Sequence, residues 1–391
     1  MRAQVGIVGA GPAGLTLALL LERAGIDCVV LESRTREYVE KRVRAGLLEQ
    51  NTVDLLHELG VGERLAREGL EHRGIFMRHR GHTQHIDMAE LTGRRITIYG
   101  QQEVVKDLIA ARLDLGAPLH FEVSEVAVHD LEGQRPRITY THAGSEHELA
   151  CDAIAGCDGF HGVCRPSIPP GLLTEHESVY DFGWLGILAE AAPTTDELIY
   201  GWHENGFALY SMRSPRISRL YLQVPADEDI ERWPDERIWE ELQTRLAAEG
   251  WSVGEGPIFE KGIAPLRSFV AEPMQYGRLF LAGDAAHIVP PTGAKGLNLA
   301  VNDVRLLAAA LVDWFRTGSS AGLDGYSTAA LRRVWRAQDF SNYMTQLLHD
   351  LGGGEFQQGL QLARLEYLER SEAAARSLAE NYVGLPAAGD F

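Results

Sequence analysis

The sequence predicts an α/β fold class, α+β overall, with a first mainly parallel sheet, a second antiparallel sheet and a helical C-terminal region. Three observations lead to this prediction. A glycine-rich turn joins a strand to a helix near the N-terminus, short strands rich in aromatic and branched residues fill the middle, and helical patterns fill the last quarter. The 391 residues, 45% of them hydrophobic, suffice for two or three domains.

The first element is a strand-like run that leads into the turn GAGPAG at residues 9–14. A helix follows and ends at Gly25, and a second strand-like run ends in the acid Glu32. This order is the fingerprint of a Rossmann-like dinucleotide-binding unit, in which glycines permit a tight turn, close approach of a pyrophosphate and helix packing, while the acid binds a ribose hydroxyl. The corresponding residues are Gly9, Gly11, Gly14 and Glu32.

The next segment, residues 33–46, carries charges of both signs. It is either a solvated helix face or a place where Arg42 and Arg44 clamp phosphates. Residues 47–70 then predict one amphipathic helix with His72 at its exit. The pattern from 74 to 100 is strand-like, and Gln101 lies at a strand-to-helix junction suited to cofactor contact or to capping.

Two later segments share one pattern, an apolar run that ends in an acid beside glycine. The first follows strands expected at 118–128 and 136–142 and ends in Asp158. The second runs from Arg278 to Asn298, where a strand leads to Asp284, a proline- and glycine-rich loop and a helix start near Leu297. The free N–H groups of that helix would face whatever the loop surrounds.

Residues 180–225 predict antiparallel strands with a hairpin at Asn205-Gly206. With a two-residue loop, Tyr200 would face Ser211 and Leu198 would face Arg213. Tyr200 and the Ser211/Arg213 pair could then hold opposite ends of one small ring. The following strand places Arg219, Tyr221 and Gln223 on one polar face, which suggests a pocket for a small aromatic carboxylate.

A helix is expected at 234–249, after which the chain returns to the first sheet. We therefore predict one domain over residues 1–175 with 268–298 returning to it, a substrate domain over 176–267, and a helical region over 299–391. The net charge of −18 argues against nucleic acid or an anionic membrane as a partner. The spacings of the four cysteines fit no metal site, and no membrane-length or signal segment is visible, so we expect a cytoplasmic protein.

Three motifs in order, GAGPAG with Glu32, CDGFHG at 157–162 and AGDAAHIVPPTGAKGLN at 282–298, resemble the single-component flavoprotein aromatic hydroxylases. The runs FGWLG, GIAPLRSF and ENYVGLP extend the resemblance, within the hydroxybenzoate branch of this family, over essentially the whole chain. The resemblance implies hydroxylation of 4-hydroxybenzoate to 3,4-dihydroxybenzoate with FAD, O2 and NADPH or NADH, through a flavin C4a-hydroperoxide, by a homodimer.

The resemblance also implies roles for single residues. FAD would contact Gly9, Gly11, Gly14, Glu32, Arg42, Arg44, Gln101, Asp284, Leu297 and Asn298. The substrate carboxylate would bind Ser211, Arg213 and Tyr221, and its phenol would contact Tyr200 and the Pro291 carbonyl. Tyr382 and His72 would extend a proton path from Tyr200 to solvent, and Arg219 would govern flavin movement.

The same resemblance places the nicotinamide donor without a Rossmann fold of its own. Its candidate contacts are Arg34, Tyr38, Arg42, Arg44, His161, Arg165 and Arg267. Arg34 and Arg36 would favour a 2′-phosphate while Glu37 and Glu40 would repel it, so the choice between NADPH and NADH stays open. Two alternatives also remain: a sister hydroxylase for another phenolic acid, and a non-enzymatic FAD-fold binding protein.

Overall fold

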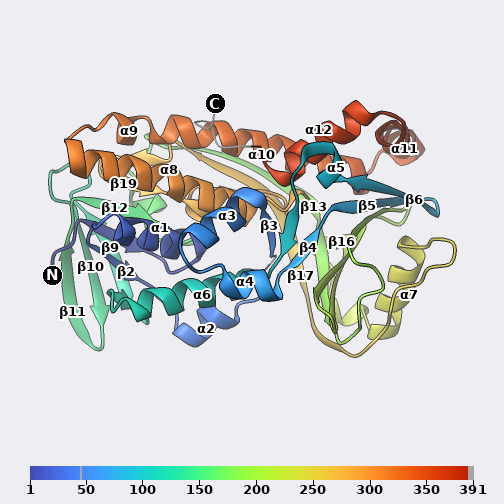
Figure 1. Cartoon of the computed structure of the whole chain (residues 1–391), viewed down its shortest axis with the longest axis horizontal. Helices are drawn as coiled ribbons and strands as arrows, with labels where there is room; N and C mark the ends of the chain where they lie inside the picture. The colour runs from blue at the N-terminus through green and yellow to red at the C-terminus, as the bar shows by residue number, and fades with distance from the viewer. Residues whose placement is uncertain (45, 386–391) are drawn as a thin grey trace.

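The structure is a computed structural model that describes residues 1–44 and 46–385 (Figure 1). Pro386, the last residue of the ENYVGLP run, therefore lies outside the described residues. A six-stranded sheet forms the first domain, and its four central strands are parallel, as the α/β prediction requires. In sheet order the strands are β18 (Gln275–Tyr276), β19 (Leu279–Leu281), β12 (Ala153–Gly156), β1 (Val5–Val8), β2 (Cys28–Leu31) and β8 (Leu119–His120).

The helix after the glycine-rich turn, α1 (Pro12–Arg23), has apolar side chains on nearly all of its faces, and protein covers it on two opposite sides. It packs between the first sheet and the long helix α8 (Gly296–Thr317), and its residues from Ala13 to Leu19 are buried. Pro12 occupies the first helical turn, where its missing N–H leaves no intrahelical bond unmade. Helix α6 (Gln101–Asp114) also packs against α1.

An eight-stranded sheet forms the second domain. Its strands are antiparallel except for one parallel pair, β14 with β5. In order they are β20 (His287–Ile288), β17 (Ile258–Glu272), β13 (Thr174–Ala189), β16 (Ile217–Pro225), β15 (Ala208–Ser214), β14 (Leu198–Trp202), β5 (Gly74–His79) and β6 (His82–Asp87). Helix α7 (Asp235–Arg245), shorter than the predicted 234–249, covers its outer face at the right of Figure 1.

The predicted domain boundaries do not follow the sheets. The strands β5 and β6 come from within the expected first domain, residues 1–175, yet they complete the second sheet beside β14. The expected return to the first domain at residue 268 falls inside β17, and β20 also belongs to the second sheet. A contact between segments more than 120 residues apart leaves no local pattern in the sequence.

The single helix expected at 47–70 is wrong. Strand β3 (Leu47–Glu49) comes first, followed by α3 (Gln50–Glu58) and α4 (Glu63–Glu68). Gly60 ends α3 because its φ of +76° lies in the left-handed region, which other residues rarely adopt. Two small three-stranded sheets flank the first domain: β3 with β7 (Ile96–Ile98) and β4 (Leu70–His72), and β11 (Ser145–Ala150) with β10 (Arg137–His142) and β9 (Ser124–His129).

The predicted hairpin register is also wrong, by two residues. Tyr200 pairs with Leu209, not with Ser211, because residues 203–207 form a longer connection than the two-residue loop expected from Asn205-Gly206. A shift of two preserves the face of each side chain, whereas a shift of one would reverse it. Tyr200, Ser211 and Arg219 therefore still lie on one face of the sheet, since Ser211 pairs with Arg219.

The C-terminal helices run along the upper edge of Figure 1, and α10 (Tyr326–Leu348) contacts both α8 and the second sheet. These helices are α9 (Ala321–Asp324), α10, α11 (Gly354–Arg370) and α12 (Glu372–Val383). Two short helices come earlier in the chain, α2 (Arg36–Lys41) after β2 and α5 (Met88–Thr92) after β6. Within the described part of the chain, no helix combines the length and apolarity needed to cross a membrane. Helix α10 packs on α8, and α12 contacts β6 of the eight-stranded sheet. The last helices therefore cover the space between the two sheets.

Candidate active site

The glycine-rich turn has the geometry of a dinucleotide-binding loop. Gly9 has φ of +107°, and a Cβ there would lie 2.3 Å from the Cys157 carbonyl oxygen. A Cβ on Gly14 would lie 2.0 Å from the Gly9 carbonyl oxygen, so only glycine lets α1 approach the turn. At Gly11 no protein atom lies within 4 Å of such a Cβ, which leaves open space at the N-terminus of α1. These features fit a bound pyrophosphate.

Glu32 ends β2 and points back to the same turn. One carboxylate oxygen accepts a hydrogen bond from the Ala10 N–H at 2.8 Å, and the other accepts one from the Arg34 N–H at 2.8 Å. The carboxylate is thus fixed beside the turn, where the sequence prediction placed a ribose ligand. Gln101 begins α6 and is partly buried, as its position at a strand-to-helix junction suggested.

Asp284 and two arginines form a charged cluster across the loop from the turn. Surrounding protein raises the pKa of Asp284, and the nearby positive charges of His287, Arg44 and Arg42 oppose that effect. Desolvation and Arg42 lower the pKa of Arg44, while Asp284 counteracts them. Asp284 remains exposed by area, so its carboxylate can still meet a ligand.

Two arginines and a tyrosine, Arg213, Arg219 and Tyr221, lie together on one face of the second sheet and form what we call the cationic wall. Burial lowers the pKa of Arg213 to about 10, with Tyr221 opposing and the neighbouring Arg219 reinforcing the decrease. The Nε of Arg213 and the Nε and Nη1 of Arg219 are buried without a hydrogen-bond partner in the described chain. Ser211 is buried opposite Arg219. Buried guanidinium nitrogens without a partner suit an anionic ligand such as a carboxylate.

Two phenols meet at the other side of this face. The Tyr200 hydroxyl lies 2.6 Å from the Tyr382 hydroxyl and donates to the Thr292 carbonyl oxygen at 3.2 Å. Burial raises the pKa of Tyr200, and the hydrogen bond with Tyr382 opposes that rise. The Pro291 carbonyl, predicted to contact the substrate phenol, accepts a hydrogen bond from the Ala294 N–H, and its contact with the substrate stays a prediction. Thr292 was missed because no pattern distinguishes one carbonyl of the loop from the next.

His72 is buried on β4, where it pairs with Ile96, and it is not joined to the two phenols. Its exposed fraction is 1%, and neither ring nitrogen has a hydrogen-bond partner among the residues that the structure describes. Burial lowers the pKa of His72 to about 4, with Glu197 and Asp196 opposing the decrease. The ring is therefore neutral near pH 7, and no direct contact links it to Tyr382.

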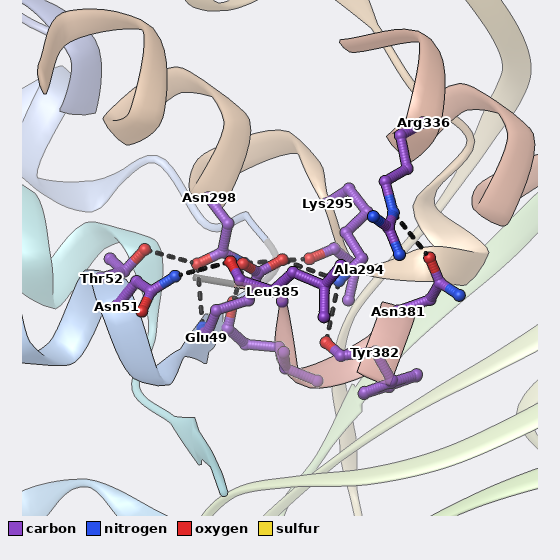
Figure 2. Close-up of polar contacts among 12 residues, drawn as sticks. Glu49, Asn51, Thr52, Ala294, Lys295, Asn298, Arg336, Asn381, Tyr382 and Leu385 are labelled. Atoms are coloured by element: carbon purple, nitrogen blue, oxygen red, sulfur yellow. Dashed lines mark hydrogen bonds and ion pairs between the residues drawn. The ribbon is translucent and has the colours of Figure 1, made fainter. Parts of the chain in front are cut away.

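Lys295 and Glu49 form a buried ion pair that sequence reasoning missed (Figure 2). The Lys295 Nζ lies 2.7 Å from Glu49 and donates to the Tyr382 carbonyl oxygen at 2.8 Å. The second Glu49 oxygen accepts from Arg333 at 2.8 Å. Lys295 is inside the glycine-rich loop that drew attention to this segment, but its partner is 246 residues away. The pair fixes the backbone of the helix that carries Tyr382.

The Asn298 side chain does not point into open space, as Figure 2 shows. Its oxygen accepts from the Glu49 N–H at 2.9 Å and from the Thr52 hydroxyl at 2.8 Å, and its amide donates to the carbonyls of Leu47 and Ala294. All of its polar capacity is used within the protein. Any contact of Leu297 and Asn298 with a flavin would therefore come from their backbone at the start of α8.

The residues expected to meet the nicotinamide donor lie in two groups. Arg34 and Tyr38 are exposed at α2, with the guanidinium over the ring at 5.3 Å. In the second group, His161 is exposed, whereas Arg165 already binds Glu175 at 2.9 Å and two backbone carbonyls. Arg267 is paired only loosely, at 3.4 Å from Glu177. His161 and Arg267 are thus freer to meet an anion than Arg165.

The family described as "FAD binding domain" matches residues 2–341. This match covers both sheets and the loop that carries Asp284. The chain belongs to this FAD-binding family. The predicted cofactor FAD and the resemblance to flavoprotein hydroxylases are thereby confirmed, and the residues around Gly11 fit such a cofactor.

The relatives of the chain agree with that membership. It is 50% identical over 389 residues to "p-hydroxybenzoate hydroxylase" of Acinetobacter baylyi, covering 99% of this chain and 96% of that protein. It is 27% identical to "3-amino-4-hydroxybenzoate 2-monooxygenase" of Streptomyces cremeus, over 79% of this chain and 78% of that protein. The structure of p-nitrophenol 4-monooxygenase from Pseudomonas putida matches in fold, with TM-score 0.85 and 20% identity over 98% of this chain and 99% of that chain.

Proposed function

We propose that the protein hydroxylates 4-hydroxybenzoate to 3,4-dihydroxybenzoate, using FAD, O2 and NADPH or NADH. The observation that carries this proposal is the pair of opposed groups on one sheet face: the Tyr200 phenol at one side, and at the other the Nε of Arg213 and the Nε and Nη1 of Arg219, which are buried and have no hydrogen-bond partner among the described residues. A para-substituted phenolic carboxylate offers a hydroxyl and a carboxylate at opposite ends of one ring. The 50% identity to p-hydroxybenzoate hydroxylase of Acinetobacter baylyi supports the same substrate.

The cofactor would be held by residues from both sides of the interdomain space. The glycines of the turn, Glu32, Arg42, Arg44, Gln101 and Asp284 would bind FAD, and the backbone at Leu297 and Asn298 would face its ring. When bound and reduced, FAD supplies the chemistry that activates O2 for transfer of one oxygen atom to the substrate ring. The start of α8, a 22-residue helix, would direct its positive dipole end toward that ring.

Arg213, Ser211 and Tyr221 would bind the substrate carboxylate and fix the ring against β15 and β16. Arg213 already donates to the Arg44 carbonyl oxygen at 2.9 Å, so it links the substrate wall to the segment expected to contact the cofactor. The same wall would help to exclude water, because buried aromatic side chains such as Trp184 and Phe207 lie beside it on the same face of the sheet.

Tyr200 would activate the substrate by a hydrogen bond to its phenolate. A phenolate ring is far more electron-rich than a phenol ring, so stabilising the anion speeds attack on an electrophilic oxygen. Tyr382, 2.6 Å from Tyr200, would pass the displaced proton onward. His72 was expected as the outer end of this path, but its ring has no hydrogen bond to Tyr382 or to any other described residue, so its role in proton transfer stays a prediction.

The deciding experiment compares the amount of hydroxylated product with the amount of hydrogen peroxide released. The FAD-loaded protein is mixed with 4-hydroxybenzoate and either NADPH or NADH, nucleotide oxidation is followed optically, and 3,4-dihydroxybenzoate is quantified against hydrogen peroxide. We expect the substrate to accelerate nucleotide oxidation and most oxidised nucleotide to yield product. If 3-amino-4-hydroxybenzoate or 3-hydroxybenzoate accelerates oxidation and 4-hydroxybenzoate does not, the substrate assignment is wrong. A protein purified without FAD would support a non-enzymatic binding role.

We also propose a homodimer through the C-terminal helices, in a cytoplasmic protein. Helix α11 carries exposed apolar side chains, including Phe356 at 78% and Tyr367 at 62% exposure, which a second copy could cover. Light scattering after gel filtration should give twice the mass of one chain, and Phe356→Ser with Tyr367→Ser should shift the protein toward one copy. A monomeric wild-type protein would disprove this part.

A further inference from the structure

A histidine that the proposed mechanism does not use, His349, lies where the end of α10 meets the second sheet. Its side chain is 0% exposed. Three aromatic rings stack around it, with ring centroids 4.3 Å away for Phe207, 4.8 Å for Phe182 and 5.9 Å for Trp184. A polar ring inside such an apolar stack needs partners for both of its nitrogen atoms, and His349 has both.

The two hydrogen bonds of His349 fix its protonation state. Its Nε2 lies 2.8 Å from the indole Nε1 of Trp184, which can only donate, so Nε2 accepts and carries no proton. Its Nδ1 lies 3.1 Å from the Thr345 carbonyl oxygen, which can only accept, so Nδ1 carries the proton and donates. The ring is therefore a neutral, single tautomer. Burial lowers the pKa of His349 to about 3, although the bond to Thr345 opposes the decrease, so the ring stays neutral near pH 7.

The bond at Nε2 leads to the carboxylate side of the proposed pocket. The Trp184 ring lies 4.8 Å from the ring of Tyr221, over which the Arg219 guanidinium lies at 5.1 Å. Tyr221 pairs with Gly186 in the sheet, and Trp184 is two residues from Gly186 along β13, so its side chain shares that face. Trp184 therefore borders the cationic wall, and its bond to His349 fixes the position of the indole there.

The bond at Nδ1 leads to the phenol side. Thr345, whose carbonyl accepts from His349, lies one turn earlier in α10. The Thr345 hydroxyl donates to the Ser341 carbonyl oxygen at 2.8 Å, so it must accept the hydroxyl hydrogen of Thr292, 3.0 Å away. The carbonyl of Thr292 in turn accepts from the Tyr200 hydroxyl at 3.2 Å. The contacts of one buried ring thus reach both ends of the proposed pocket.

The backbone around His349 is held independently of its ring. The Gln223 side chain bonds to both backbone groups of Asp350, accepting from the N–H at 2.9 Å and donating to the carbonyl at 2.6 Å. The Gln361 side chain on α11 donates to the His349 carbonyl oxygen at 2.7 Å. A substitution of the His349 ring therefore changes the partners of Trp184 and Thr345 without releasing the end of α10.

We propose that His349 is a positioning residue for the hydroxylation of the bound substrate. Its Nε2 holds Trp184 beside the cationic wall. Its Nδ1–H holds Thr345, which in turn supports the Thr292 carbonyl at the Tyr200 hydroxyl. This inference rests on the proposed function, because it takes the space between Tyr200 and the cationic wall as the substrate pocket. If the ring instead only fills space in the aromatic stack, two substitutions should have the opposite order of effect.

The test uses two variants that each keep one property of the ring. His349→Phe keeps an aromatic ring in the stack but offers Trp184 no acceptor. His349→Gln loses the ring but can place an amide oxygen near the position of Nε2. Product per oxidised nucleotide and the dissociation constant of 4-hydroxybenzoate are measured on the FAD-loaded proteins.

We expect product per oxidised nucleotide to fall at least about threefold in His349→Phe and the dissociation constant to rise about three- to tenfold, as an unpaired buried donor implies. His349→Gln should recover more than about half of the wild-type product yield, because the indole N–H again has an acceptor. A product yield in His349→Phe that equals or exceeds the yield in His349→Gln would overturn the proposal, since packing alone would then account for the residue.

Should His349→Phe not fold, Thr345→Val tests the second bond with almost no change of volume. It leaves the Thr292 hydroxyl without its acceptor, so the share of hydrogen peroxide should rise at least about twofold. Thr345→Ser, which keeps a hydroxyl, should behave as the wild type. An unchanged product share in Thr345→Val would likewise overturn the proposal.

Tyr210→Phe is the matched control for the loss of a buried hydroxyl. Tyr210 is 0% exposed on β15 and its hydroxyl accepts from the Thr194 N–H at 2.7 Å, but its side chain lies on the opposite face of the sheet from Ser211. Tyr210→Phe should lower the free energy of unfolding in urea and leave the product share unchanged. The control thus separates a loss of stability from a loss of positioning.

Two further measurements separate this inference from the proposed function. Product formation by the wild type from 4-hydroxybenzoate tests the proposed function alone, and if the wild type prefers another phenolic acid, the same ratios among the variants are measured with that acid. Nuclear magnetic resonance of ¹⁵N-histidine-labelled protein needs no substrate. The signals that disappear in His349→Gln should show a neutral ring protonated at Nδ1 from about pH 5 to 8. A ring protonated at Nε2 would overturn the proposal.

Discussion

The hydroxyl pair of Tyr200 and Tyr382 makes the first residue-scale prediction. Tyr200→Phe removes the group that would stabilise the substrate phenolate but keeps the ring that fills the pocket. We expect substrate binding and nucleotide oxidation to persist while oxygen leaves mainly as hydrogen peroxide. Loss of the bonds to Thr292 and Tyr382 should cost about 1 kcal/mol of stability. Product and peroxide assays decide; an unchanged product yield would remove Tyr200 from the mechanism.

Arg213 makes the second residue-scale prediction. Arg213→Ala deletes the buried cation expected to bind the substrate carboxylate, so the dissociation constant of 4-hydroxybenzoate should rise about 10- to 100-fold. Flavin absorbance changes on titration with substrate provide the measurement. Arg216→Ala, which removes the same charge from an exposed turn between β15 and β16, is the control and should bind normally. A normal affinity in Arg213→Ala would exclude the carboxylate role.

The positions of site residues could be predicted from the sequence where a local pattern or a family motif contains them. Glu32, Asp284 and the glycines follow from strand ends and turns, and the structure places them beside the same space. Lys295 with Glu49 was not predictable, because an ion pair between residues 246 apart leaves no local trace. The partners of Asn298 were missed for the same reason: an asparagine at a helix start can serve a ligand or the protein equally well.

At the scale of an element, two glycines of the glycine-rich turn have different roles: Gly11 borders the space for the cofactor, whereas Gly14 is needed for the packing of α1. Gly11→Ala meets no protein atom, so it should change the unfolding free energy by less than about 1 kcal/mol yet weaken FAD retention. Gly14→Ala forces α1 away from the Gly9 carbonyl and should cost about 1–3 kcal/mol or more. Urea unfolding of the FAD-free protein, together with FAD titration, distinguishes the two. Equal effects of both substitutions would contradict this assignment of the two glycines.

Elements were predicted better than their partners. The strand–turn–helix at the N-terminus and the helix predicted to begin near Leu297 were found, because periodicity and glycine placement are local signals. The hairpin register failed because Asn-Gly, a strong two-residue turn signal, here lies inside a longer loop. The observed register differs from the predicted one by two residues, an even number, so the predicted polar side chains still lie on the same face of the sheet. The pairing of β14 with β5 depends on tertiary packing and could not be read from either strand.

At the scale of the whole molecule, one buried pair ties the two domains together. His287 on β20 of the second sheet lies 2.6 Å from Asp303 on α8, and the same carboxylate oxygen accepts the Gly283 N–H at 3.0 Å. Burial alone lowers the pKa of His287, but Asp303, Asp284 and a backbone hydrogen bond together outweigh it, so the net shift is upward from 6.5. The folded protein then binds this proton more tightly than the unfolded chain does.

The stability that His287 contributes should therefore be complete below about pH 6.5 and decline as the pH rises through the elevated folded pKa. We expect the difference in unfolding free energy between the wild type and His287→Gln to be largest near pH 6 and to shrink steadily above 6.5. Urea titrations at several pH values measure it. His176→Gln, from an exposed pair with Glu272 at 3.5 Å, should show little difference at any pH. A constant His287 difference would refute the linkage.

The position of Tyr382 in the last helix has a consequence for biosynthesis. The dinucleotide sheet is complete once β19 has been made, but the hydroxyl partner of Tyr200 and the backbone held by Lys295 arrive only with α12. Because domains begin to fold as the chain emerges, a nascent protein could form its nucleotide-binding sheet long before its substrate pocket is closed. On the proposed function, completion of translation would then act as a safeguard, since only a chain with α12 in place would couple oxygen consumption to ring hydroxylation.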